Sequence, residues 1–268
     1  MTSTDLARAA TTLLFVPGDR PERFEKAAAA GADLVVVDLE DAVPHDNKVI
    51  ARGHVTEWVA TGHPCAVRIN AADTGYFAGD LDALTGLGAT IMVAKAESPD
   101  IVQKVAEVTG CGVIALIETA LGVLNAPQIA AIPGVVRLAI GTFDLSAQLG
   151  VDPLDTDALL ASRSALVLAS AAAGLAGPLD GVTAGVDDAD GITAAVTHAR
   201  RLGYAGKLCI HPRQLAPTGA AFAPSDEEVE WARTIVDAVD FDGVAVVDGQ
   251  MVDKPVVDRA EQILKRIR

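Results

Sequence analysis

The feature that most constrains the fold is a regular alternation of short apolar runs with alanine-rich segments along the chain. Eight of the runs have the length and the β-branched composition of β-strands. These runs are residues 12–18, 34–40, 65–70, 90–95, 112–118, 135–144, 178–182 and 207–211. Because the segments between them have helical patterns, the sequence predicts repeated βα units around a parallel sheet.

Eight strands with intervening helices predict a closed (β/α)8 TIM barrel, which we place at residues 1–222. The run at 178–182 is short and contains a glycine, so a doubly wound open sheet is the alternative. Residues 223–268 form a C-terminal extension that we expect to act as a lid within the same structural domain. In this extension, two apolar arms around Asp248-Gly249 predict a hairpin, and residues 254–268 predict a closing helix.

The composition indicates an aliphatic core and argues against nucleic-acid binding and membrane insertion. Half of the residues are hydrophobic and only 4% are aromatic, so the core must consist mainly of Ala, Val, Leu and Ile. The net charge of −15 argues against general nucleic-acid binding, which needs a basic surface. The apolar runs are far shorter than the roughly 20 residues of a membrane span. Without a secretory signal pattern, and with Cys65, Cys111 and Cys209 widely spaced, we expect a cytoplasmic protein with reduced thiols.

Charged residues stand where most of the apolar runs stop. In a TIM barrel the C-terminal ends of the strands form the active site, so we expect these side chains to converge. They are Asp38, Glu40, Asp41, Arg68, Asn70, Lys95, Glu118, Asp144 and His211. A solvated or ion-paired strand end is the simpler interpretation of any one of them, but it accounts poorly for so many together.

Glu118 is the most informative of these residues, because it ends an apolar run and an unpaired buried carboxylate is costly. Carboxylates packed together repel one another unless a cation joins them, and a hard divalent ion suits oxygen ligands. We therefore predict Mg²⁺, or alternatively Mn²⁺, bound by Glu118 and Asp144. Arg68 can hold a carboxylate through two parallel hydrogen bonds. A metal beside an arginine predicts a 2-oxo-acid site with carbon–carbon bond chemistry next to a carbonyl group.

In their order along the chain, the motifs resemble the citrate lyase β subunit-like branch of the HpcH/HpaI aldolase and acyl-CoA lyase superfamily. The matching stretches are "LLFVPGDRPERFEKA", "DLVVVDLEDAV", "AVRIN", "VAKAES", "ALIETALG", "IGTFDLSAQLG", "CIHPRQL" and "GQMVDKPVVDRAEQIL". They cover almost the whole chain. The resemblance implies a (β/α)8 barrel, assembled as a homotrimer or a dimer of trimers, that cleaves or forms a β-hydroxyacyl thioester with Mg²⁺.

The resemblance also implies roles for individual residues. Glu118 and Asp144 match the metal ligands, and Glu118 thereby also contacts the substrate. Arg68 matches the arginine that holds the carboxylate of the oxo acid. Asp253 matches an aspartate that a lid brings over the site of a neighbouring subunit, where it serves as a general acid or base.

An acidic cluster follows the second apolar run. Asp38, Glu40 and Asp41 match residues that hold metal-bound waters and orient Arg68, and we count Asp41 among the catalytic residues. Metal-dependent aldolases that act on free aldehydes have a histidine base in this segment, whereas this chain has Asp41. That departure favours thioester substrates.

Coenzyme A, as part of the substrate, needs cations for its phosphates. Arg20, Arg23 and Lys26 lie at the opening of the first helical segment after the first strand, where a helix N-terminus favours anions. Ordinary solvated helix charges are an equally open interpretation of these three residues. Lys95 lies near so many carboxylates that an ion pair is favoured over an imine-forming lysine.

The function expected from the sequence is a Mg²⁺-dependent carbon–carbon lyase. It would cleave or condense citramalyl-, malyl- or citryl-CoA, releasing an acyl-CoA and a 2-oxo acid. The alternatives are a free-standing metal-dependent 2-oxo-acid aldolase and a citrate lyase β component that needs acyl carrier partners. The expected partners are small molecules, and neither nucleic acid nor membrane.

Overall fold

The computed structural model describes residues 1–238, 245–247 and 250–267 of the chain. The chain divides into two compact units, Met1–Thr218 and Gly219–Arg268. The division falls inside helix α10 (Leu215–Phe222), so the first unit ends before residue 222, where the sequence placed the end of the barrel.

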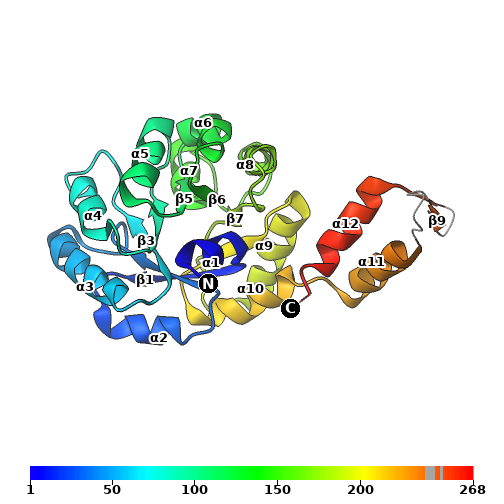
Figure 1. The fold of residues 1–268 in the computed structure, drawn as a ribbon, viewed down its shortest axis with the longest axis horizontal. Coiled ribbons are helices and arrows are strands. Elements are labelled where there is room, and N and C mark those ends of the chain that lie inside the picture. Colours follow the sequence, from blue (N-terminus) through cyan, green and yellow to red (C-terminus); the bar gives the residue numbers. More distant parts are fainter. Residues whose placement is uncertain (239–244, 248–249, 268) are drawn as a thin grey trace. The chain divides into compact units, whose positions relative to one another are not determined.

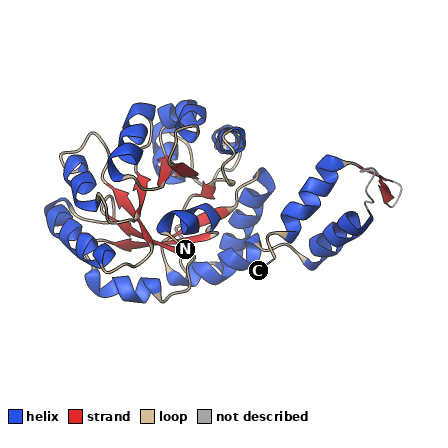
Figure 2. Cartoon of the chain, in the orientation of Figure 1, coloured by secondary structure: helices blue, strands red, loops and turns tan. Residues whose placement is uncertain are grey.

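The first unit is built around eight parallel strands that close into a barrel in chain order. Helices surround these strands (Figures 1 and 2). The strands are β1 (Thr12–Pro17), β2 (Leu34–Asp38), β3 (Cys65–Ile69), β4 (Thr90–Val93), β5 (Val113–Ile117), β6 (Val135–Ile140), β7 (Leu179–Asp180) and β8 (Gly206–Cys209). Pairing of Thr12 with Lys207 joins β1 to β8 and closes the ring. The predicted (β/α)8 barrel is confirmed, and the open-sheet alternative is wrong.

The helices between the strands begin and end where the local sequence dictates. In α5 the Ser98 hydroxyl accepts a hydrogen bond from the Ile101 N–H, Pro99 opens the helix, and Gly110 ends it in the left-handed conformation. The helical segments that follow the strands are η1 (Pro21–Arg23), α2 (Phe24–Ala28), η2 (His45–Asn47), α3 (Lys48–Ala60), α4 (Phe77–Leu84), α5 (Pro99–Thr109), α6 (Ala120–Ala130), α7 (Thr142–Leu149), α8 (Leu160–Ala172), α9 (Ala189–Leu202), η3 (Pro212–Gln214) and α10.

Alternating strand side chains divide the core of the first unit into two layers. One cluster, including Leu13, Val36 and Leu208, fills the barrel, and a larger one lies between the strands and the helices. Both clusters are mainly aliphatic, as the composition predicts. Cys65 and Cys209 are buried within the fold, Cys111 is half-buried, and all three are free thiols.

An N-terminal helix that the sequence analysis did not predict, α1 (Ser3–Ala9), packs where the strands start. Its hydroxyl groups accept hydrogen bonds from backbone N–H groups that open two strands: Ser3 Oγ from Cys65, at 3.3 Å, and Thr4 Oγ1 from Gly112, at 3.2 Å. The helix therefore satisfies polar backbone groups at the bottom of the barrel, opposite the expected site.

A buried arginine of β6 binds the C-terminal end of α1. Arg137 is 1% exposed, and its Nη1 donates to the carbonyl oxygens of Arg8 at 2.8 Å and Ala10 at 3.1 Å, while its Nε donates to that of Gly177 at 2.6 Å. Burial lowers the pKa of Arg137 to about 10. The positive charge lies where the last carbonyl groups of a helix favour a cation.

Several strands stop before the apolar runs that predicted them. The sixth run was expected to reach residue 144, but β6 ends at Ile140 and Asp144 lies in the first turn of α7. The Gly141 N–H still bonds the Ile117 carbonyl at 2.9 Å, and the chain then turns into the helix. Asp144 is therefore presented by a helix and not by a strand.

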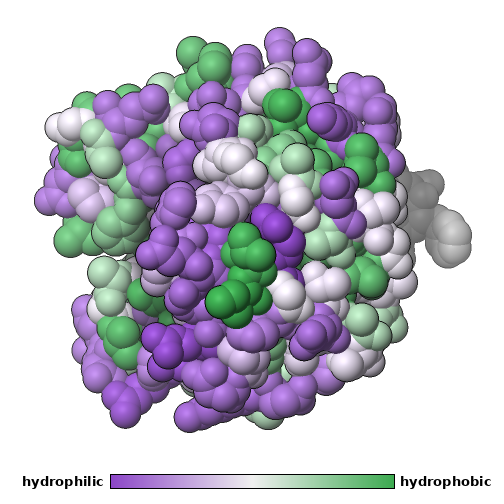
Figure 3. Space-filling model, turned by 90° about the vertical axis from the view of Figure 1, so that its left-hand side faces the viewer, coloured by the Kyte–Doolittle hydropathy of each residue, from purple (hydrophilic) through white to green (hydrophobic). Residues whose placement is uncertain are grey.

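The surface of the first unit is mixed. Figure 3 shows the side on which α3 and α4 lie, which is largely hydrophilic with a small hydrophobic patch near its centre. On α3, Val49 and Ile50 are exposed. No helix within the described residues is both long enough and apolar enough to cross a bilayer.

After the end of α10, the described part of the second unit contains α11 (Asp226–Ala238), β9 (Ala245–Val247), β10 (Gln250–Val252) and α12 (Lys254–Leu264). Ala232, Ile235 and Ala260 belong to a small separate core between the helices. The antiparallel pairing of β9 with β10 confirms the predicted hairpin, and α12 confirms the closing helix. The predicted turn at residues 248–249 lies outside the described residues.

Candidate active site

An ion pair between neighbouring strands anchors the C-terminal face of the barrel. Asp38 and Arg68 occupy paired positions in β2 and β3, so their side chains project from the same face of the sheet. Arg68 grips the carboxylate bidentately, with Nε at 2.7 Å from Oδ1 and Nη2 at 2.6 Å from Oδ2. Asp38 also accepts the N–H groups of Glu40 at 2.9 Å and Ala42 at 3.0 Å. The orientation of Arg68 is thus fixed by a buried and fully bonded carboxylate.

Two further carboxylates contact the guanidinium. Arg68 Nη1 lies 3.0 Å from Glu40 Oε2 and 3.6 Å from Asp41 Oδ2, and the group stacks 4.9 Å from the centre of the Phe15 ring. Although burial opposes it, the charges of Asp38 and Glu40 raise the pKa of Arg68. Glu40 is 5% exposed, whereas the Asp41 side chain is 59% exposed and faces solvent. The acidic cluster predicted from the sequence therefore does surround Arg68.

Lys95 links this cluster to the next strand. Its ammonium lies 2.7 Å from Glu40 Oε1, and its backbone N–H donates to Glu118 Oε1 at 2.7 Å. Although burial opposes it, the hydrogen bond to Glu40 and the charge of that residue raise the pKa of Lys95. The expected ion-pair role is confirmed by these contacts, and the lysine stays protonated.

Glu118 follows the last residue of β5 and is 2% exposed. Burial, together with the charges of Glu40 and Asp144, raises its pKa to about 7, against the opposing effects of the Lys95 N–H and Arg68. A buried carboxyl group between two other carboxylates is poorly stabilised as an anion without a further cation.

Gly141 leaves room beside Glu118. A Cβ atom at position 141 would lie 2.5 Å from the Glu118 Cβ, 3.3 Å from its Cδ, and in direct collision with Oε2. Because position 141 has no side chain, the Glu118 side chain fits beside the backbone there, and Lys95 bonds its Oε1. Asp144, half-buried in the first turn of α7, is close enough to raise the pKa of Glu118.

Lys48 makes contacts in the site for which the sequence analysis assigned it no role. Its ammonium donates to the carbonyl oxygens of Leu39 at 2.8 Å and Glu40 at 2.7 Å, which fixes the loop that carries the acidic cluster. Lys48 is the first residue of α3, where the helix dipole disfavours a positive charge. A lysine at the start of a helix is therefore a sequence signal for a specific contact.

Two predicted strand-end residues make structural contacts instead. Asn70 donates through its backbone N–H at 3.0 Å and its Nδ2 at 2.7 Å to the fully buried Asp80, which is paired with Arg52. His211 accepts the N–H of Arg213 at 3.2 Å and caps a short 3₁₀ helix. Neither contact involves the carboxylate cluster.

The remaining predicted residues belong to other segments of the chain. Asp253 belongs to the second unit, where it precedes α12, is exposed, and makes no capping hydrogen bond through its side chain. Arg20, Arg23 and Lys26 follow β1 and are exposed. They lie on a 3₁₀ turn and the five-residue α2, so the helix expected at this place is shorter than predicted.

The charges of the cluster fit one divalent cation. The cluster holds more carboxylates than cations; the carboxylates are Asp38, Glu40, Asp41, Glu118 and Asp144, and the cations are Lys48, Arg68 and Lys95. Within the described part of the chain, no group of three His, Cys, Asp or Glu side chains is placed to hold a metal. An ion here would therefore use the two carboxylates of Glu118 and Asp144, with water or substrate oxygens completing its shell.

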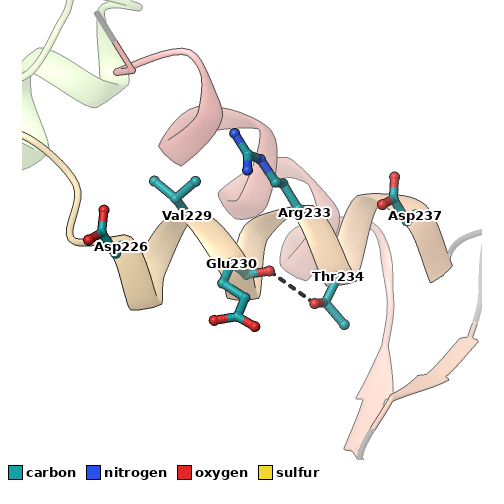
Figure 4. Close-up of a pocket in the computed structure, with 6 residues that line it drawn as sticks. All are labelled: Asp226, Val229, Glu230, Arg233, Thr234 and Asp237. Carbon is teal, nitrogen blue, oxygen red and sulfur yellow. Dashed lines mark hydrogen bonds between the residues drawn. The ribbon is translucent and has the colours of Figure 1, made fainter.

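The second unit carries a pocket of a different kind. A depression of about 440 Å³ runs along α11 and is lined by that helix alone (Figure 4). Its polar groups are mostly acidic, and the Thr234 hydroxyl bonds the Glu230 carbonyl at 2.9 Å. It includes none of the residues of the carboxylate cluster, so the strand-end cluster is the candidate active site.

Comparison with known proteins identifies the family of the chain. A model of the HpcH/HpaI aldolase/citrate lyase family matches residues 11–212. A citrate lyase subunit beta-like protein of Mycobacterium tuberculosis is 40% identical over 261 residues, covering 94% of each chain. A (3S)-malyl-CoA thioesterase of Cereibacter sphaeroides is 37% identical over 268 residues, covering 95% of this chain and 93% of the relative.

A solved structure agrees with these sequence matches. The crystal structure of the protein CitE from Mycobacterium tuberculosis, in complex with magnesium, acetoacetate and coenzyme A, superposes with a TM-score of 0.85 at 39% identity. The match covers 97% of this chain and 98% of the other. Because the family model covers most of the chain and the relatives match nearly end to end, this chain belongs to the HpcH/HpaI aldolase/citrate lyase family.

Proposed function

We propose that the protein is a Mg²⁺-dependent carbon–carbon lyase that cleaves or forms a β-hydroxyacyl-CoA. Its substrates would be citramalyl-, malyl- or citryl-CoA, which yield an acyl-CoA and a 2-oxo acid. The observation that carries the proposal is Glu118, a buried carboxylate with a raised pKa that lies beside a second carboxylate and a fixed arginine. The solved relative that binds magnesium, acetoacetate and coenzyme A supports the same chemistry.

Glu118 and Asp144 are the proposed ligands of Mg²⁺, with Mn²⁺ as the alternative ion. The raised pKa of Glu118, which burial and the charges of Glu40 and Asp144 cause, fits a divalent cation at this place. A bound divalent ion supplies a Lewis acid, which stabilises negative charge that develops on a carbonyl oxygen.

Arg68 is the proposed binding residue for the carboxylate of the 2-oxo acid. Its side chain is 11% exposed, and Asp38 holds the guanidinium through two hydrogen bonds, so the group is oriented before substrate arrives. The conformational entropy of this side chain is therefore lost when the protein folds and not when the substrate binds. Glu40 and Asp41 contribute by fixing the third nitrogen of the guanidinium and by holding water near the site.

Proton transfer is assigned to Asp41 and Asp253. The Asp41 side chain is 59% exposed, so solvent reaches its carboxylate. The Asp253 carboxylate is free of capping bonds. We propose that Asp253 protonates the thioester enolate after a lid formed by residues 223–268 covers the site of a neighbouring subunit. That arrangement requires an oligomer, and we propose a homotrimer or a dimer of trimers in the cytoplasm.

Coenzyme A is the proposed carrier, and Arg20, Arg23 and Lys26 are the candidate partners of its phosphates. These side chains are exposed, and the two arginines lie as far as 3.9 Å from the nearest carboxylates of Asp19 and Glu22. Such loose surface pairs contribute little and yield readily to a phosphate.

The test is a panel of malyl-, citramalyl- and citryl-CoA, assayed with and without Mg²⁺ for release of the 2-oxo acid and of free coenzyme A thiol. The proposal predicts oxo acid and acyl-CoA, but no free thiol. Failure to cleave any of the three thioesters would refute it. Activity that appears only with acyl carrier partners would indicate a citrate lyase component, and cleavage of free hydroxy-oxo acids alone would indicate an aldolase.

Thioester hydrolysis is the second candidate function, because the relative from Cereibacter sphaeroides named (3S)-malyl-CoA thioesterase matches 95% of the chain. A thioesterase would release free coenzyme A thiol together with malate, and it would form no 2-oxo acid. The same panel therefore separates the two reactions by their products.

A further inference from the structure

Lys95 contacts two carboxylates of the site through different parts of the residue. Its backbone N–H donates to Glu118 Oε1 at 2.7 Å, and its ammonium binds Glu40 Oε1, also at 2.7 Å. Its φ angle is 47°, and it has the one positive φ among the non-glycine residues that the structure describes. A residue with a side chain adopts this left-handed conformation at a cost, so its surroundings must demand it.

Both oxygens of Glu40 are held by cations. Oε1 bonds Lys95 and Oε2 lies 3.0 Å from Arg68 Nη1, while the side chain is 6% exposed. Because Lys95 bonds Glu40 through its ammonium and Glu118 through its backbone N–H, one residue spans the separation between these two carboxylates. A carboxylate this close to an ion bound by Glu118 and Asp144 is itself a potential ligand, because Mg²⁺ binds carboxylate oxygens.

We propose that Lys95 is a positioning residue that keeps Glu40 out of the coordination shell of the divalent ion, so that positions stay open for the 2-oxo acid. The inference rests on the proposed function. Lys95 acts on the two carboxylates differently. Its N–H bonds one oxygen of Glu118 and leaves the other oxygen for the ion, whereas its ammonium binds Glu40. Open positions distinguish catalytic metal sites from closed structural ones.

The consequence is a counterintuitive change in metal affinity. Lys95→Met frees one oxygen of Glu40, which can then join Glu118 and Asp144 on the ion. We expect the full-length variant to bind Mn²⁺ about tenfold more tightly, the change that one added contact of about 1.4 kcal/mol gives. The bound ion should carry fewer waters, and pyruvate should bind the Mn²⁺-loaded variant more weakly.

The measurements are the electron paramagnetic resonance signal of free Mn²⁺ for affinity and water-proton relaxation for the number of bound waters. Lys95→Gly should behave like Lys95→Met, because glycine keeps the N–H and suits a φ of 47° while removing the ammonium. Lys104→Met, at an exposed lysine of α5, removes the same charge and should leave both signals unchanged.

A Glu40→Gln background separates repositioning from simple charge removal. If Glu40 becomes a ligand, Lys95→Met should lose most of its tightening in that background. Equal tightening with and without Glu40, or unaltered water relaxation in Lys95→Met, would overturn the inference while the proposed function stands. A wild-type protein that binds no Mn²⁺ would overturn both.

Discussion

Ionisation of Glu118 should weaken the metal-free protein as the pH rises. Burial, followed by the charges of Glu40 and Asp144, raises its pKa from 4.5 to about 7. In the unfolded chain the group loses its proton near the lower value, so between the two values the folded state binds more protons and the free energy of unfolding falls with pH. At about 1.4 kcal/mol for each pKa unit, the loss across this range is about 3 kcal/mol.

Urea unfolding of the metal-free protein, from roughly pH 5 to pH 8, measures this loss. Glu118→Gln keeps the shape of the side chain without the proton equilibrium, so its stability should decline by about 3 kcal/mol less than that of the wild type over the same range. Glu57→Gln, at an exposed position of α3, should retain the wild-type slope. Saturating Mg²⁺ should restore the wild type at the upper pH and leave Glu118→Gln unchanged. Parallel curves for the wild type and Glu118→Gln would refute the reasoning.

Three other substitutions test separate parts of the structure. Gly141→Ala forces Glu118 to shift, and we expect it to lower the free energy of unfolding by about 1–3 kcal/mol and to weaken Mn²⁺ binding in calorimetric titration. The control is Gly53→Ala, at an open position in α3, which should not destabilise the protein. Arg137→Met leaves buried carbonyl groups without donors and should cost roughly 3–5 kcal/mol in thermal unfolding; an unchanged melting temperature would contradict this. Arg68→Lys should keep the fold but lower kcat/KM at least about 100-fold, since lysine lacks the paired donors.

Much of the barrel could be predicted because each βα unit carries its own local signals. The β-branched runs, and the Ser98-Pro99 start and Gly110 stop of α5, act over a few residues and need no tertiary information. The misplaced strand ends have a tertiary cause, since a strand ends where its neighbour stops pairing and not where the apolar run stops. The predicted sixth run continued through Gly141 and Thr142 although both residues are tolerated in turns, whereas β6 ends at Ile140.

The sequence predicted which residues lie in the candidate site better than it predicted the contacts between them. Charged residues at strand ends predicted Asp38, Arg68 and Glu118, because the fold brings all strand ends to one face. The left-handed backbone of Lys95 could not be predicted, since it follows from holding two carboxylates at once. The role of Lys48 could not be predicted, because its ammonium bonds backbone carbonyl groups and the sequence pattern of side chains does not show such contacts.

The closure of the barrel has a consequence for how the chain acquires its structure. Thr12 of β1 finds its second neighbour in Lys207, and the carbonyl of Ala10 receives the Arg137 guanidinium 127 residues further along. During synthesis, one edge of β1 therefore stays unpaired until β8 has emerged from the ribosome, when nearly the whole barrel has been made. Unpaired strand edges recruit other chains, so the yield of refolding should fall as protein concentration rises.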